Sequence, residues 1–160
     1  MLDAVILGAG PAGCAVAARL LQRGVTRFAV LERYGFPRDK PCGGGLTGHA
    51  DEALAALDLE LRVPRVPAPR ACVRYGAFER TIDMQRPVNV VRRHDFDADL
   101  VAQVRAKGAE VREDCAVEAI AVHADRVSVT LSGNRTVVAR VSVWFESHLE
   151  EAWDVIDQTP

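Results

Sequence analysis

The first part of the chain alternates between short apolar runs and one helical stretch. Residues 4–7 form an apolar run, residues 12–21 are nearly all compatible with a helix, and residues 28–31 form a second apolar run. Gly24 follows the helical stretch, at a place where a glycine commonly ends a helix. The pattern predicts a strand, a helix and a second strand in direct succession, which is the usual start of a parallel sheet.

The middle of the chain predicts a shaped loop, a helix and a hairpin. Residues 33–48 contain two prolines, five glycines and four charged residues, so we expect a loop with unusual backbone geometry. Residues 50–57 predict a helix, whereas residues 59–70 carry three prolines and predict an irregular connection. Short β-type runs over 71–75 and 79–83 predict a hairpin that lies over the main sheet.

A third helix is flanked by two further apolar runs. Residues 89–91 predict a strand, residues 95–107 an amphipathic helix, and residues 109–112 another strand. Gly108 stands where this helix would end. We expect these elements to form a second β-α-β unit in the parallel sheet.

The last part of the chain predicts antiparallel strands followed by an acidic helix. Alternation of apolar and polar residues implies strands with one buried and one solvent-facing side. A further strand is expected over residues 141–145, and a helix beginning at Ser147 is expected over 147–156. The strands of the meander are predicted at residues 117–122, 127–131 and 136–139.

Together these elements predict an α/β fold of the Rossmann-like type, with a parallel sheet and an appended antiparallel β-meander. The 160 residues suffice for one hydrophobic core, and 49% hydrophobic with 26% charged residues exclude an intrinsically disordered chain. We expect one dinucleotide-binding domain over residues 1–145 and a separate acidic segment over residues 146–160.

Charge balance and cysteine spacing exclude several classes of function. The chain has 20 basic and 22 acidic side chains, and its net charge of −2 gives no overall attraction to nucleic acid. No apolar run reaches membrane-spanning length and the first strand begins too early for a signal peptide, so we expect a cytoplasmic protein. The histidines and cysteines lack metal-ligand spacing, so no metal site is predicted.

The strongest chemical signal is the glycine pattern at the end of the first predicted strand. Gly8 permits a tight turn, Gly10 allows the backbone to approach a pyrophosphate, and Gly13 allows the helix to pack closely against the strand. Glu32 follows Gly13 by about 20 positions, the spacing at which a carboxylate accepts from a ribose hydroxyl. The alternative is a tight turn between strand and helix in a protein that binds no nucleotide.

Two further segments are candidates for ligand contact. Cys42, Gly43 and Gly44 present almost no side chains, which would let a planar ligand approach the backbone, although a flexible linker has the same composition. The glycine neighbours of Cys42 favour such a close approach over a thiolate nucleophile. Arg92 and Arg93 precede the third helix, where they could contact phosphate or ribose or could be surface residues.

Four segments of the sequence are typical of one group of flavoproteins. They are Gly8-Ala-Gly-Pro-Ala-Gly13, Glu32, the run Phe-Pro-Arg-Asp-Lys-Pro-Cys-Gly-Gly-Gly-Leu over 36–46, and Arg93-x-x-Phe-Asp-x-x-Leu100. With these segments the chain resembles the amino-terminal flavin-binding half of FAD-dependent oxidoreductases of the geranylgeranyl reductase type. Their relatives include the aromatic-ring hydroxylases and the flavin-dependent halogenases.

The resemblance implies FAD as the cofactor and assigns a place on it to each motif. The glycine-rich turn would hold the pyrophosphate, and the loop at residues 42–45 would pass close to the isoalloxazine ring. Glu32 would bind the adenosine ribose, Arg93 would reach back to the cofactor, and the backbone near Val117 would border the adenine. The cofactor-binding residues expected in full are Gly8, Gly10, Pro11, Ala12, Gly13, Glu32, Arg33, Cys42, Gly43, Gly44, Arg93 and Val117.

The resemblance also implies an activity, namely reduction of double bonds in an isoprenoid or related apolar small molecule. Two alternatives stay open: an FAD-dependent monooxygenase or halogenase, and a non-catalytic dinucleotide-binding or interaction module. Members of the resembled family are more than twice this length, and bulky Trp144 and Phe145 stand where they have small residues. We therefore expect a truncated domain that is inactive alone, has no assigned catalytic residue, and forms a homo-oligomer or needs a completing partner chain.

Overall fold

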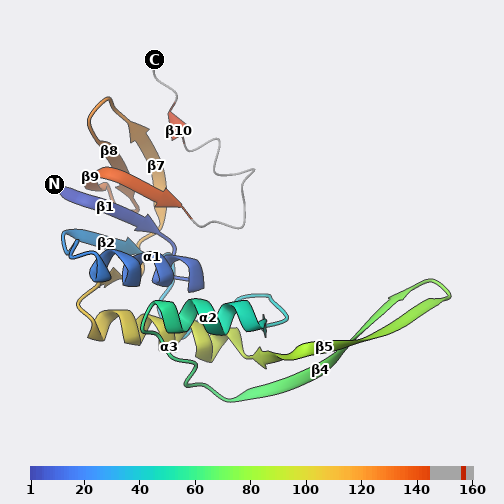
Figure 1. Cartoon of the computed structure of the whole chain (residues 1–160). Coiled ribbons are helices and arrows are strands. Elements are labelled where there is room, and N and C mark those ends of the chain that lie inside the picture. The colour runs from blue at the N-terminus through green and yellow to red at the C-terminus, as the bar shows by residue number, and fades with distance from the viewer. Residues whose placement is uncertain (145–155, 158–160) are drawn as a thin grey trace.

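A computed structural model describes residues 1–144 and 156–157, which form a layered body with a long protruding arm (Figure 1). The main sheet has the strand order β10-β7-β8-β9-β1-β2-β6. Its parallel part contains β1 (Leu2–Leu7), β2 (Phe28–Leu31) and β6 (Glu110–Arg112). The predicted parallel start of the sheet is therefore confirmed.

Two helices cover one face of the parallel strands. The helices are α1 (Pro11–Gln22) and α3 (Arg93–Ala106), and α2 (Gly48–Ala56) lies beside them (Figure 1). All three were predicted, with ends that differ from the observed ones by two residues or fewer. None of the helices in the described part of the chain is long and apolar enough to cross a bilayer. The core beneath them includes Ala4, Ile6, Ala17, Phe28, Val30, Phe96, Leu100 and Val104.

The antiparallel meander supplies the second core. It consists of β7 (Val117–Val122), β8 (Val127–Leu131) and β9 (Arg135–Trp144), as predicted except that the expected strands 136–139 and 141–145 merge into β9. β9 also pairs with β1 in parallel and places Trp144 opposite Leu7. This core includes Val5, Leu7, Ala29, Leu31, Ile120, Val129, Leu131 and Ala139.

The carboxyl-terminal segment is described only at β10 (Ile156–Asp157), which pairs in parallel with β7. The helix expected over residues 147–156 lies outside the described residues except for Ile156, which is in this strand. The expected boundary between residues 145 and 146 also falls at the end of the described part. The separate acidic segment stays a prediction.

The arm is a long hairpin that belongs to a second sheet. It is built from β4 (Arg65–Tyr75) and β5 (Phe78–Val91), and β3 (Gly45–Leu46) pairs with the root of β5. The prediction that the hairpin lies over the main sheet is wrong, because the hairpin extends away from the body (Figure 1).

The connection predicted over residues 59–70 is also partly wrong, since β4 begins at Arg65. Its prolines, Pro67 and Pro69, are tolerated because β4 is an edge strand with β5 as its one partner. The pairing also shifts register between Ala68 and Arg70, next to Pro69.

The predicted second β-α-β unit does not form. Residues 89–91 are the end of β5, so they belong to the arm's sheet, whereas β6 after α3 belongs to the main sheet. The N–H of Val91 donates to the carbonyl of Gly44 at 3.0 Å, which ties this strand end to the glycine-rich loop. A three-residue apolar run carries no information about which sheet it joins. The sequence-based assignment of residues 89–91 to the parallel sheet was therefore wrong.

Candidate functional site

The glycine-rich turn lies at the carboxyl ends of β1 and β2. Gly8 has a φ of +97°, and its N–H donates to the carbonyl of Leu31 at 2.8 Å. Helix α1 then begins at Pro11, with no side chain capping its Gly10 N-terminus and no acidic residue in its first turn. The first N–H groups of a helix have no partner within the helix, so this edge of the sheet offers hydrogen-bond donors and a positive dipole end.

The close packing expected at Gly13 is present. A Cβ atom added there would collide with the carbonyl oxygen of Gly8, so only a glycine allows the turn to lie against α1. Gly10 has a different environment, because an added Cβ would lie 3.9 Å from Nη2 of Arg93 and 4.0 Å from Nη2 of Arg38. The turn therefore borders two guanidinium groups.

Glu32 is held at the end of β2, directly beside this turn. Its side chain is buried, and its Oε2 accepts from the N–H of Ala9 at 2.8 Å. Its backbone N–H donates to the carbonyl of Arg112 at 2.9 Å, and its carbonyl accepts from the N–H of Cys115 at 2.8 Å. Strand end, turn and carboxylate are thus fixed relative to one another.

Four charged side chains form a network beside the turn, which we call the charge network: Glu32, Arg38, Arg93 and Asp97. Arg38 donates from Nε to Glu32 Oε1 at 3.1 Å and from Nη1 to Asp97 Oδ2 at 3.4 Å. Asp97 is fully buried and accepts two bonds from Arg93, at 2.6 Å and 2.8 Å. Two cations and two anions balance one another in this network.

The balance has consequences for the protonation and the position of these groups. The hydrogen bonds from Arg93 to Asp97 raise the pKa of the Arg93 guanidinium, which therefore stays charged. In the described part of the chain, every buried side-chain nitrogen and oxygen has a hydrogen-bond partner. The ring of Phe36 lies 4.9 Å from the Arg38 guanidinium carbon and covers it. The charge network is electrically balanced, and its hydrogen bonds hold the Glu32 carboxylate in place.

The loop at residues 42–44 is shaped and anchored. Gly44 has a φ of +68°, and an added Cβ would collide with the Val91 carbonyl oxygen. The neighbouring Gly43 is not restricted in this way, because an added Cβ there would meet no atom within 4 Å. Since Gly45–Leu46 then pairs with β5, the linker interpretation of this segment is not supported.

Cys42 is exposed on this loop and lies close to the charge network. The N–H of Gly44 donates to its Sγ at 3.4 Å. This bond, together with a hydrogen bond from Arg93, lowers the pKa of the Cys42 thiol. The environment therefore favours a thiolate more than the sequence suggested.

The structure brings most of the predicted residues together. Pro11 and Ala12 form the first turn of α1 beside Gly10. Val117 begins β7, two residues after the Cys115 N–H that binds the Glu32 carbonyl. Arg33 is different, because it is exposed and stacks on Tyr34 at 5.5 Å, outside the charge network. The residues gathered at one edge of the sheet are Gly8, Gly10, Gly13, Glu32, Arg93 and Cys42.

Sequence reasoning missed two members of the charge network, Arg38 and Asp97. Asp97 stands four positions after Arg93 on α3, so an ion pair on one helix face could have been expected. Arg38 gave no such signal, because its position within a proline-containing loop does not reveal which side of the chain it faces.

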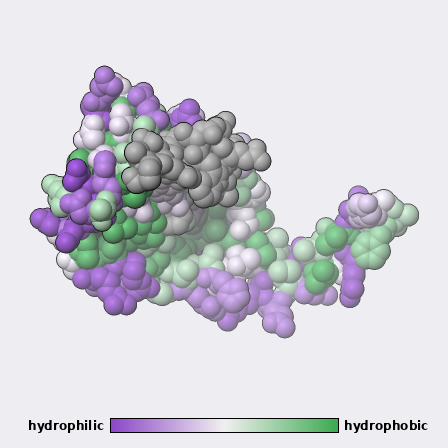
Figure 2. Space-filling model, turned by 90° about the horizontal axis from the view of Figure 1, so that it is seen from above, coloured by the Kyte–Doolittle hydropathy of each residue, from purple (hydrophilic) through white to green (hydrophobic). Residues whose placement is uncertain are grey.

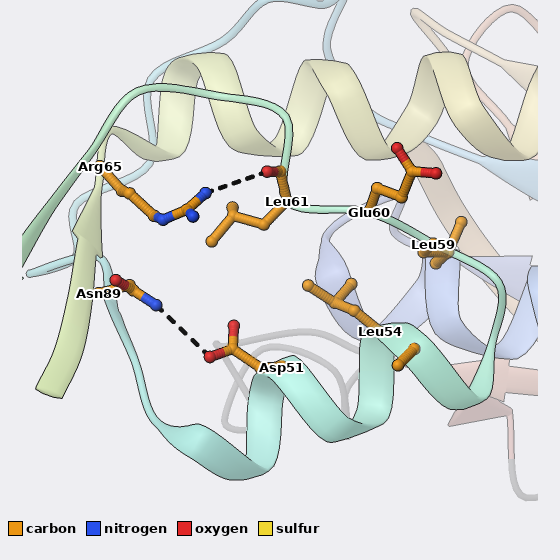
Figure 3. A pocket seen from close by; sticks show the side chains of 8 residues that line it. Asp51, Leu54, Leu59, Glu60, Leu61, Arg65 and Asn89 are labelled. Atoms are coloured by element: carbon orange, nitrogen blue, oxygen red, sulfur yellow. Dashed lines mark hydrogen bonds between the residues drawn. The ribbon is translucent and has the colours of Figure 1, made fainter. Parts of the chain in front are cut away.

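A separate cavity of about 310 Å³ lies between α2 and the root of the arm (Figure 3). Leu54, Leu59 and Leu61 line it, and hydrogen bonds from Asn89 to Asp51 and from Arg65 to the Leu61 carbonyl lie at its side. It contains none of the predicted site residues. Among residues 1–144 and 156–157, no group of His, Cys, Asp and Glu side chains is arranged to hold a metal ion.

Sequence comparison identifies relatives that are much longer than this chain. An uncharacterized protein of Methanosarcina barkeri is 52% identical over 110 residues, which cover 67% of this chain and 27% of that protein. The menaquinone reductase of Mycobacterium tuberculosis is 34% identical over 149 residues, covering 86% of this chain and 36% of the reductase. The chain thus spans well under half the length of these relatives.

Structural comparison shows the same fold in several flavoproteins. The p-nitrophenol 4-monooxygenase PnpA of Pseudomonas putida matches 91% of this chain and 41% of its own, with a TM-score of 0.76 and 21% identity. The halogenase PltM in complex with phloroglucinol and FAD matches 92% of this chain and 35% of its own, with a TM-score of 0.75 and 20% identity. The FAD binding domain family matches residues 1–143. The chain therefore belongs to the FAD binding domain family, and its cofactor is FAD.

Proposed function

We propose that this chain forms the FAD-binding part of a reductase that saturates a double bond in an isoprenoid or related apolar substrate. The observation that carries the proposal is the 34% identity to a menaquinone reductase across 86% of the chain. The monooxygenase and halogenases share the fold at 19–25% identity, so they do not favour their own reactions for this chain.

The geometry of the turn supports binding of the FAD pyrophosphate at the start of α1. Gly13 allows α1 to approach Gly8, and the space beside Gly10 is bordered by the Arg93 and Arg38 side chains. The helix dipole and the first N–H groups of α1 favour a negatively charged group at this position. The charges of Arg38 and Arg93 are balanced by Glu32 and Asp97 within the charge network.

Glu32 is the residue that would accept from the ribose hydroxyls. Its carboxylate is fixed by the Ala9 N–H and by Arg38, so it has a defined position before any ligand arrives. Such preorganisation lowers the ordering cost of binding. A carboxylate here also disfavours a 2′-phosphorylated nucleotide through charge repulsion.

The loop at residues 42–44 would border the flavin ring. When bound, FAD supplies hydride transfer, while the protein supplies position and electrostatics. Gly43 leaves room for a planar group, and Arg93 connects the loop to the glycine-rich turn through Cys42 and Gly10. Residues that contact the substrate are not assigned on this chain, so we expect the isolated chain to reduce no substrate.

A chimera tests the proposal. Residues 1–140 of this chain replace the aligned region of the Mycobacterium tuberculosis menaquinone reductase, and both FAD content and menaquinone reduction are measured. We expect stoichiometric FAD and a reductase activity that Glu32→Ala lowers. A folded chimera that holds FAD but leaves menaquinone unreduced would contradict the reductase assignment, and one that takes up no FAD would favour a non-catalytic module.

A further inference from the structure

The carboxylate of Glu32 is saturated with hydrogen bonds from the protein itself. Its Oε2 accepts from the Ala9 N–H at 2.8 Å and from Nη2 of Arg38 at 3.2 Å. Its Oε1 accepts from Nε of Arg38 at 3.1 Å and from the Tyr34 N–H at 3.3 Å. An ionised carboxylate has about four lone-pair sites, so these bonds leave no site for the hydroxyl groups of a ribose.

The donors to Glu32 differ in how readily they can leave it. Ala9 lies in the turn between β1 and α1 and donates from the main chain, so its N–H stays beside the carboxylate. Arg38 donates from the end of a long side chain in the loop between β2 and β3, and this side chain is 13% exposed. Rotations about its side-chain bonds move the guanidinium without any change in the fold. Arg38 is therefore the donor that can be exchanged.

Arg38 has a second carboxylate and an aromatic ring that hold it. Its Nη1 lies 3.4 Å from Oδ2 of Asp97, and its guanidinium carbon lies 4.9 Å from the centroid of the Phe36 ring. A half-buried cation without any opposite charge nearby would be costly. The guanidinium avoids that cost when it leaves Glu32, because Asp97 still faces it.

The same guanidinium borders the glycine-rich turn. Nη2 of Arg38 lies 4.0 Å from the position of a Cβ added to Gly10, which is the residue just before α1. A ligand seated on this turn and the Arg38 side chain therefore share the space in front of Glu32.

We propose that Arg38 and the ribose hydroxyls of the adenosine half compete for Glu32, so that Arg38 leaves the carboxylate when the ribose binds. Bonds from the two hydroxyls replace the two bonds from Arg38, while the Ala9 N–H keeps the carboxylate in place. A ligand without these hydroxyls offers Glu32 no donor and leaves the Arg38 pair intact. The inference rests on the ribose role proposed for Glu32 and is independent of the reaction.

Adenosine and 2′,3′-dideoxyadenosine test the competition, because they differ only in the two hydroxyls and neither carries a phosphate. Their dissociation constants are measured at mildly alkaline pH with the wild-type chain and with Arg38→Met. We call the ratio of the two constants the hydroxyl preference. We expect it to rise by about tenfold in Arg38→Met, because the hydroxyls no longer have to displace a charged donor from Glu32. A purely structural role of Arg38 would change both constants alike.

The matched control removes an arginine from an ion pair far from the site. Arg74→Met breaks the pair of Arg74 with Glu79 at 2.8 Å on the arm, which extends away from the body (Figure 2). The hydroxyl preference of this variant should equal that of the wild type. In Glu32→Ala/Arg38→Met the rise should disappear, because the carboxylate is gone. Circular dichroism shows whether each variant is folded.

Nitrogen NMR of the arginine side chains supplies a second measurement, made on the wild-type chain. The Nε–H signal of Arg38 is identified by its loss in Arg38→Lys, and its hydrogen exchange with water is measured before and after FAD is added. We expect exchange to become at least about tenfold faster with FAD, because the bond to Glu32 ends. The Nε–H of Arg93, which donates to Asp97 at 2.6 Å, should stay slow.

The outcomes separate this inference from the function proposed above. A hydroxyl preference that Arg38→Met leaves unchanged or lowers, or an Arg38 exchange rate that FAD does not change, would overturn the competition. FAD uptake that depends on Glu32 would then still support the ribose role of this residue. If the chain takes up no FAD, or if Glu32→Ala binds it as tightly as the wild type, both the ribose role and the competition fail.

Discussion

The backbone N–H of Ala9 donates to Oε2 of Glu32 at 2.8 Å, which joins the glycine-rich turn to the end of β2. The two residues are far apart in sequence, yet both follow the carboxyl end of a parallel strand. Ligands of open α/β sheets bind in the crevice beyond these strand ends. This bond therefore places the carboxylate that we propose for the ribose beside the backbone that we propose for the pyrophosphate.

Removal of the Glu32 carboxylate should weaken FAD binding. We expect Glu32→Ala to cost about 1–3 kcal/mol of binding free energy, the range for a lost hydrogen bond to a charged group. Glu32→Gln keeps an acceptor for Ala9 and should have a smaller effect. The dissociation constants are measured by flavin fluorescence titration, with the exposed Asp39→Ala as the matched control; unchanged affinity in Glu32→Ala would remove this residue from the site.

The close approach of α1 to the turn should make Gly13 irreplaceable. Gly13→Ala places a Cβ against the Gly8 carbonyl oxygen, so we expect lost FAD binding and a lower melting temperature. Strain of this kind costs at least about 1–3 kcal/mol. Gly43→Ala is the control for stability, since its Cβ would meet no atom within 4 Å. Equal melting temperatures for the two variants would show that the turn is looser than described.

Asp97 should matter for the stability of the whole domain. Asp97→Asn leaves Arg93 without its carboxylate partner and removes the second acceptor of Arg38, in a position that is fully buried. Breaking such a buried pair costs about 3 kcal/mol. Urea unfolding measures the loss. The control is Asp95→Asn on the same helix, where the half-exposed pair with His94 contributes about 1 kcal/mol or less; similar losses in both variants would contradict the buried network.

Cys42 should react with alkylating agents at lower pH than an ordinary thiol. Its pKa is lowered by the Gly44 N–H and by Arg93, so a larger thiolate fraction persists as the pH falls. We expect Arg93→Met to shift the labelling profile to higher pH, because one of the two causes is removed. The experiment uses Cys72→Ser to remove the other exposed thiol.

Cys14 provides an internal reference for that experiment. Burial raises the pKa of its thiol to about 12, so it should stay unlabelled while the protein is folded. Cys42→Ala should retain flavin binding, because no step of the proposed role requires the thiol. A labelling profile that Arg93→Met leaves unchanged would show that Arg93 does not act on Cys42.

Local signals in the sequence predicted the geometry of the glycine-rich turn better than the architecture around it. The turn at Gly8, Gly10 and Gly13 follows from steric demands within a few residues, and the spacing to Glu32 follows from one helix and one strand. By contrast, the two ion-pair partners of Arg38 are Glu32, which follows β2, and Asp97 on α3, and only the folded chain brings them together.

The bounds of the strands in the arm could not be predicted from local sequence either. Prolines at 67 and 69 indicated an irregular connection, but an edge strand tolerates them. The short β-type runs over 71–75 and 79–83 did predict a hairpin around Gly76, and Tyr75 does pair with Phe78 across the turn. It could not predict that the strands continue to Arg65 and Val91, because sheet membership depends on contacts with the glycine-rich loop, such as the bond from Val91 to Gly44.

Equilibrium titration of FAD with the purified chain tests the central claim most directly. The account predicts saturable binding of one FAD per chain, observed as quenched flavin fluorescence and a shifted visible spectrum, and loss of this binding in Gly13→Ala. Circular dichroism of the same samples reports whether each chain is folded. A folded wild-type chain that takes up no FAD would contradict the account. Equal affinities for FAD in the wild-type chain, Gly13→Ala and Glu32→Ala would contradict it as well.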